Sequence, residues 1–178
     1  MELSRLSREI QSNPQEVIEM FNRIVVAIDT SEYSLRVIPT ALEVAQKFRS
    51  EVFVLHVFEH DRGRSVVYSD ESTAEAMRLV TDALKLMKDG GVSADGQVHD
   101  IAAGHVAEDI VETAGAFRAD LIVMGSRGLS DVQGILLGSV AHKVIHLAAI
   151  PVLVARGPIP VKMRASQPAM AGLPAMAY

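Results

Sequence analysis

Short, continuously apolar runs recur along this chain, and they constrain the fold more than any other feature. Residues 24–28 are all apolar and mostly β-branched, and charged residues bound them on both sides. A run of this length without alternation is typical of a strand buried on both faces, as in a parallel sheet. Similar strands are expected at residues 52–58, at 121–124 and, after Pro151, at Val152–Ala155. A weaker strand is expected near residues 97–102, because Asp95 and Gly96 interrupt the pattern before it.

Stretches with helical periodicity separate these runs. Apolar residues three or four apart predict helices over residues 35–48, 72–88, 105–117 and 139–147. Pro39 lies inside the first pattern and predicts either a late helix start or a kink, since proline lacks a backbone donor. Ser72 and Glu75 have the spacing of a capping box for the second helix. Strands that alternate with helices predict an α/β fold, a doubly wound parallel sheet with helices on both faces.

Composition narrows the class of protein. The 178 residues are 49% hydrophobic and 22% charged, which is typical of a globular domain. A net charge of -5 argues against nucleic acid as the main partner, and the absence of cysteine excludes disulfides and thiolate chemistry. The longest apolar run, residues 147–155, has nine residues, whereas a membrane span needs about 20. We therefore expect a cytoplasmic protein with no membrane or nucleic-acid partner.

The chain is expected to form one α/β domain over residues 23–156, with a further segment on each side. Residues 1–22 carry several charges and no continuous apolar stretch, so they are unlike a signal peptide and are interpreted as an N-terminal extension. Residues 157–178 hold four of the seven prolines and lack periodicity, which predicts a flexible C-terminal tail.

A glycine-rich connection follows the strand at residues 121–124. Gly125, Gly128, Gly138 and Ser139 give it the spacing G-x2-G-x9-G-S, and Arg127 lies within it. Glycines can adopt positive φ and let a phosphate approach the backbone, and the start of the next helix offers free N–H groups and a positive dipole end. The Ser139 hydroxyl could cap that helix or bind phosphate, and Arg127 could add a charged contact. The spacing fits neither G-x-x-x-x-G-K-[ST] nor G-x-G-x-x-G, so a plain strand–loop–helix connection is the alternative.

This spacing resembles the ATP-binding signature of the universal stress protein family, G-x2-G-x9-G-(S/T). The flanking segments resemble the same family at residues 24–31, 55–57, 120–128, 138–141 and 151–154. The similarity covers about residues 23–156. It implies a five-stranded parallel sheet in the order 3-2-1-4-5, in which the winding reverses between the first and fourth strands. Asp29 and the glycines would meet there, at the place where doubly wound sheets bind ligands.

The resemblance also implies a ligand, a set of contacts and a partner. The ligand would be ATP, or else ADP or AMP, with or without Mg. Asp29 and Val57 would lie near the adenosine, and the glycine-rich connection would hold the ribose and phosphates. Ala141 replaces a hydroxyl residue of other members, which would remove one phosphate contact. The family implies a homodimer formed through the last strand, Val152–Ala155, an edge that needs covering in any case. The expected nucleotide-binding residues are Asp29, Thr30, Ser31, Val57, Met124, Gly125, Arg127, Gly128, Gly138, Ser139 and Val140.

The histidines point to no metal or catalytic site. His142 and His146 are four residues apart on a predicted helix, but two exposed histidines explain this spacing better than a metal does. His56 lies in a predicted buried strand and is expected to be a hydrogen-bonded core residue. The other three are expected in or beside loops: His60, His99 and His105.

The expected function is that of a nucleotide-binding regulatory protein of the stress response, which holds or senses ATP as a homodimer. A slow ATPase or phosphate-transferring enzyme is an alternative, but Asp29 is the only acidic residue that can be placed near the phosphates, and no catalytic residue is predicted. Asp29 could instead be a plain cap for the helix that follows it. A nucleotide-free scaffold that binds partners through its sheet edge and tails is a third interpretation.

Overall fold

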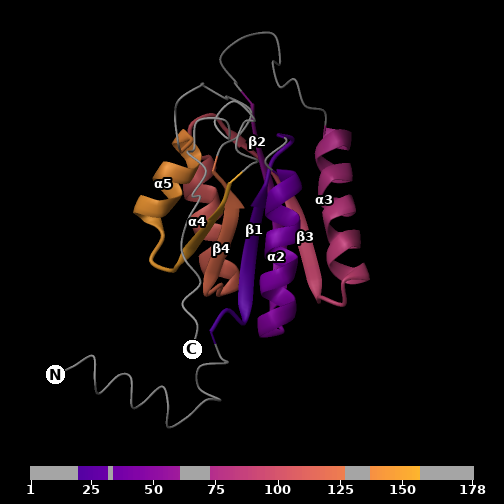
Figure 1. Cartoon of the computed structure of the whole chain (residues 1–178). Helices are drawn as coiled ribbons and strands as arrows, with labels where there is room; N and C mark the ends of the chain where they lie inside the picture. Colours follow the sequence, from indigo (N-terminus) through magenta and orange to yellow (C-terminus); the bar gives the residue numbers. More distant parts are fainter. Residues whose placement is uncertain (1–19, 32–33, 61–72, 127–136, 157–178) are drawn as a thin grey trace, which may run out of the picture.

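The protein forms a sheet of five parallel strands in the order β3-β2-β1-β4-β5, which confirms the expected strand order (Figure 1). The structure is a computed structural model, and it describes residues 20–31, 34–60, 73–126 and 137–156. The winding reverses between β1 and β4, since the chain first moves from β1 towards β3 and then crosses to β4 and β5. The strands are β1 (Arg23–Ile28), β2 (Glu51–His60), β3 (Ala94–Ala102), β4 (Leu121–Gly125) and β5 (Val152–Ala155).

Helices cover both faces of this sheet, as expected for a doubly wound fold (Figure 1). On one face, α2 (Ser34–Phe48) and α3 (Thr73–Asp89) pack on a core that includes Val26 and Val54. On the other face, α4 (Val106–Phe117) and α5 (Ser139–Leu147) pack on a second core that includes Val25 and Leu55. Neighbouring residues of β1 and β2 thus point to opposite cores, which explains why these strands are apolar without alternation.

The third strand is longer than predicted, because Asp95 and Gly96 belong to it instead of interrupting it. Gly96 pairs in register with Val54 of β2. A Cβ atom built on Gly96 would lie 2.5 Å from the Val54 carbonyl oxygen and 3.1 Å from Val80 Cγ1. The glycine is therefore required by the close approach of β2 and α3, and it does not mark the end of the strand.

Two details of the predicted helices can be compared with the structure. The first helix begins at Ser34, five residues before Pro39, which excludes the late start, and the alternative, a kink at the proline, stays a prediction. The helix continues through the proline to Phe48. For the second helix, Ser72 lies outside the described residues, so its proposed capping box stays a prediction. The helix itself ends at Asp89, where Gly91 has a φ of 78° and donates its N–H to Lys88 O.

Asp120 joins the start of β1 to the start of β4. Its Oδ2 accepts a hydrogen bond from the Asn22 N–H at 2.8 Å, and its Oδ1 accepts one from the Arg23 N–H at 3.0 Å. Its own N–H donates to Arg23 O at 2.9 Å. Just before this junction, Phe21 packs edge-on against Phe48 of α2, with ring centroids 5.2 Å apart. The chain therefore enters the sheet at a fixed point.

Replacing Asp120 with alanine is expected to lower the free energy of unfolding by about 1–2 kcal/mol, because two backbone N–H groups lose a charged acceptor. Urea denaturation followed by circular dichroism measures this change. Asp82→Ala is the matched control, since Asp82 is exposed on α3. An equal loss in the two variants would contradict a stabilising role for Asp120.

Candidate functional site

The carboxyl edge of the sheet brings together residues that are far apart in the sequence. Ala27 of β1 pairs with Met124 of β4, so Asp29 and Ser126, which follow the ends of these strands, lie side by side. The Ser126 N–H donates to Ala155 O at 2.9 Å, and the Gly138 N–H donates to Ser126 O at 2.7 Å. The second bond places the start of α5 directly beside the end of β4.

The turn from β1 to α2 is organised by the Asp29 carboxylate. Asp29 Oδ1 accepts hydrogen bonds from the Ser31 N–H at 3.1 Å, from the Ser31 hydroxyl, and from the Ser34 hydroxyl at 3.0 Å. In return, the Asp29 N–H donates to Ser34 Oγ at 2.8 Å, and Ser34 is buried. Oδ1 therefore orders the turn before α2 and does not cap the helix, because none of these donors is a backbone N–H of α2. Oδ2 is the atom through which Asp29 could accept a ligand hydroxyl. Thr30, between these residues, is exposed.

Val57 lies at the same edge, on the face covered by α4 and α5. Its neighbour His56 pairs with Ile28, the last residue of β1, so Val57 is level with Asp29. Val57 is half-buried and packs against the second core. Met124 and Val140 also pack in that core. Any contact they make with a ligand would therefore fall to their backbone or to the exposed edge of the side chain.

The structure describes Gly125 and Gly138 of the glycine-rich connection. Gly125 is the last residue of β4 and pairs with Ala155, so it has the extended backbone of a strand and does not use the positive φ that a glycine allows. The N-cap of α5 is Gly138, with φ -69° and ψ 161°, and Ser139 is already the first helical residue. Of the two roles considered for Ser139, helix capping is excluded, because a cap residue has non-helical backbone, and phosphate binding stays a prediction. Its side chain is exposed.

The start of α5 is suited to holding an anion. The N–H groups of the first helical turn have no carbonyl partner within any α-helix, and they carry the positive end of the helix dipole. In α5 these residues are Ser139, Val140 and Ala141, and they lie beside the carboxyl edge. Ala141 is buried in the second core, so its side chain faces the sheet. Arg127 and Gly128 lie outside the described residues, and their contacts stay a prediction.

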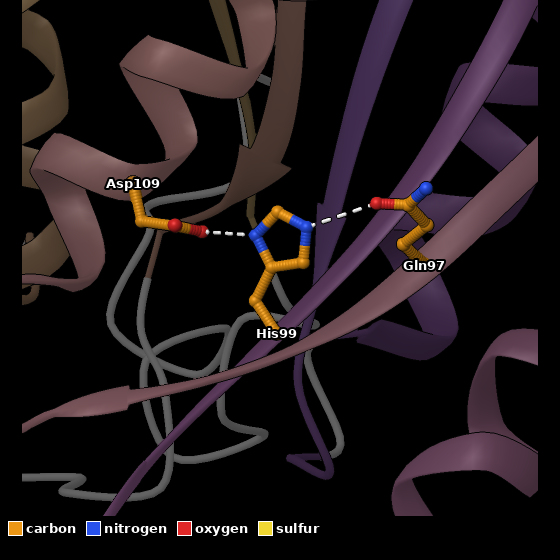
Figure 2. A network of polar contacts seen from close by, with 3 residues as sticks. All are labelled: Gln97, His99 and Asp109. Carbon is orange, nitrogen blue, oxygen red and sulfur yellow. Dashed lines mark hydrogen bonds and ion pairs between the residues drawn. The ribbon is translucent and has the colours of Figure 1, made fainter.

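A histidine network was missed at this edge of the sheet (Figure 2). His99 was placed in or beside a loop, although the strand predicted near residues 97–102 includes it; it belongs to β3 and pairs in register with Val57. Its Nδ1 lies 2.7 Å from Asp109 Oδ2 of α4, and its Nε2 lies 3.1 Å from Gln97 Oε1 (Figure 2). The alternate spacing of Gln97 and His99 in the predicted strand placed both side chains on one face, but nothing in the sequence indicated Asp109 as the partner of His99.

The other histidines mostly follow expectation. His56 is buried, and its Nδ1 lies 2.9 Å from Ile28 O, which confirms a hydrogen-bonded core residue. His142 and His146 are exposed on α5, with ring centroids 4.4 Å apart. Within residues 20–31, 34–60, 73–126 and 137–156, no three or more His, Asp or Glu side chains gather in a group that could hold a metal ion. No helix in the same ranges is long and apolar enough to span a membrane.

The strand order and the reversal between β1 and β4 define a doubly wound α/β protein, a class that binds ligands at the carboxyl edge. The model of the universal stress protein family matches residues 20–156, and the chain belongs to that family.

Individual relatives agree with this assignment. The universal stress protein YxiE of Bacillus subtilis is 31% identical in an alignment 156 residues long, which covers 77% of this chain and 100% of YxiE. The structure of the universal stress protein from Archaeoglobus fulgidus in complex with dAMP is 30% identical, with a TM-score of 0.58 over 77% of this chain and 98% of that chain. A universal stress protein in complex with cAMP is 25% identical, with a TM-score of 0.59 over 79% of this chain and 100% of that chain.

Proposed function

We propose that this protein binds an adenine nucleotide, with ATP as the expected ligand, and acts as a regulatory protein of the stress response. The observation that carries the proposal is the meeting of the Asp29 turn with the start of α5 across the switch point between β1 and β4. The complexes of relatives with dAMP and cAMP support adenine as the base.

Each part of the proposed site supplies one kind of contact. Asp29 accepts a ribose hydroxyl through Oδ2, since Oδ1 is occupied by Ser31 and Ser34. Val57 and the turn at Thr30 flank the adenine. The N–H groups of Ser139 and Val140 receive a phosphate at the helix start. Gly125, Arg127, Gly128, Gly138 and Met124 complete the set inferred from the family motif.

The edge strand β5 is proposed as the dimer interface. It pairs only with β4 in the sheet of the described residues, and Val152, Leu153 and Val154 are partly exposed. An apolar edge strand left uncovered promotes uncontrolled pairing, so a second copy of the chain is a suitable cover.

ATP is expected to raise the melting temperature of the protein. At 100 times Kd the bound nucleotide adds about 2.7 kcal/mol of stability, which corresponds to roughly 5–10 °C in a domain of this size. Differential scanning fluorimetry with ATP, and with CTP as the control for adenine selectivity, measures the shift. If millimolar ATP gives no shift and denatured pure protein releases no nucleotide, the proposed function is wrong.

A further inference from the structure

Lys143 of α5 reaches a turn that belongs to a different part of the fold. Its Nζ donates a hydrogen bond to Gly104 O at 3.3 Å, and Gly104 lies in the turn from β3 to α4 with a φ of 92°. The Gly104 N–H donates to Glu59 Oε1 of β2 at 2.6 Å. One peptide turn is thus held between the end of β2 and the second turn of α5.

This contact locates the ammonium group at the carboxyl edge. Lys143 follows Ser139 by four residues, so the two side chains lie on the same side of α5. Helical side chains lean towards the N-terminus of their helix, which carries the ammonium back towards the first turn. Gly104 lies between the end of β3 and the start of α4. Because the strands are parallel, its carbonyl oxygen lies at the carboxyl end of the sheet, as Asp29 and Gly125 do.

The bond to Gly104 is weak enough to be exchanged. Charge-assisted N–H···O bonds measure about 2.7–2.9 Å, whereas this one measures 3.3 Å and its acceptor is a neutral carbonyl. Lys143 is exposed, and an ammonium has three donors. A phosphoryl oxygen is a stronger acceptor than the Gly104 carbonyl, so a phosphate chain at this edge would draw the ammonium to itself.

We propose that Lys143 binds the outer phosphates of the nucleotide and makes the site prefer nucleoside di- and triphosphates to monophosphates; this inference rests on the proposed function. The N–H groups at the start of α5 suffice for a single phosphate. A longer phosphate chain carries more negative charge at an edge that already holds Glu59 and Asp29. Lys143 is the lysine of α5, and its positive charge would offset the added negative charge of the longer phosphate chain.

The test compares ATP and AMP affinities by isothermal titration calorimetry in the wild type and in Lys143→Met, which keeps the length of the side chain and removes its charge. ATP binding is expected to weaken about tenfold or more, and AMP binding less than twofold. Lys143→Arg should restore much of the preference for ATP, because it retains the charge. Lys88→Met is the control on the opposite face, at an exposed site on α3.

The possible results separate the two proposals. If the wild type binds neither ATP nor AMP, the proposed function itself fails. If the wild type binds ATP and Lys143→Met binds it equally well, or loses ATP and AMP by the same factor, the role of Lys143 is overturned. A lower melting temperature of nucleotide-free Lys143→Met, with an unchanged ratio of ATP to AMP affinity, would show that Lys143 only holds the Gly104 turn in place.

Discussion

The Gly138→Val variant is expected to fold and to lose nucleotide binding, with an affinity for ATP reduced on the order of a hundredfold or more, about 3 kcal/mol. Gly138 has φ -69° and ψ 161°, an extended conformation that valine adopts readily. The backbone therefore does not require a glycine at this position. A ligand that comes close to the start of α5 does require one, because a side chain would fill the space in front of the first-turn N–H groups.

The measurement is the ATP-dependent rise in melting temperature, together with calorimetric titration. The nucleotide-free variant should lose only about 1 kcal/mol, since valine is a poorer N-cap than glycine. Gly115→Ala is the control, because Gly115 lies on α4 and a Cβ atom there meets nothing within 4 Å. Unchanged ATP binding by Gly138→Val would show that the phosphates do not approach the start of α5. The family motif predicts the same loss of binding for a bulky residue at Gly128.

The Gly96→Ala variant is expected to lose about 3 kcal/mol of stability. The new methyl group would lie 2.5 Å from the Val54 carbonyl oxygen, which belongs to the backbone of the neighbouring strand. Relief of this contact requires β2 and β3 to separate, and relief of the 3.1 Å contact with Val80 Cγ1 requires the Val80 side chain to shift. Each movement disturbs the first core. Urea denaturation should show a lower midpoint, with ATP binding retained wherever the protein is still folded.

Gly115→Ala is also the control for this prediction, because the same glycine-to-alanine change is expected to raise stability there instead of lowering it. Gly115 lies inside α4 with open space around it, so alanine should raise stability by about 0.5–1 kcal/mol through its better helix propensity. A loss of less than 1 kcal/mol in Gly96→Ala would mean that β3 relaxes without cost at that point. The pair of variants thus separates close packing from the general effect of replacing a glycine.

Much of the fold could be predicted because the strands that build it are buried on both faces. Residues 24–28 contribute side chains alternately to the two cores, so every position of the run is apolar. An uninterrupted apolar run therefore indicates a central strand. The edge strand β3 lacks this signal. Its burial alternates between half-buried and exposed, so polar residues and a glycine are compatible with it. Its first residues could be recognised only once Gly96 was seen opposite Val54.

Part of the candidate site could also be predicted from the sequence, and part could not. Its glycines and Ser139 belong to one motif that is continuous in the sequence, so these residues could be proposed together, whereas Asp29 and Val57 come from other strands. The bonds that Asp29 makes with Ser31 and Ser34 are local, but they order the turn before α2 and are not the helix cap that had been considered. Contacts between distant segments carried no signal. Lys143 and Gly104 are 39 residues apart, and their contact arises only from the crossing of α4 and α5 beside the same edge.

The Asp120 junction bears on where a label or fusion partner can be joined to the chain. Because every strand is parallel, the described chain enters the sheet at the edge where Asp120 binds Asn22 and Arg23, and leaves it after Ala155, beside Gly125. The described chain therefore begins, at Met20, at the end of the sheet opposite the proposed nucleotide site and stops, at Arg156, next to that site. A fluorescent label attached at Met20 should leave access to the proposed site open, whereas one attached at Arg156 should obstruct it.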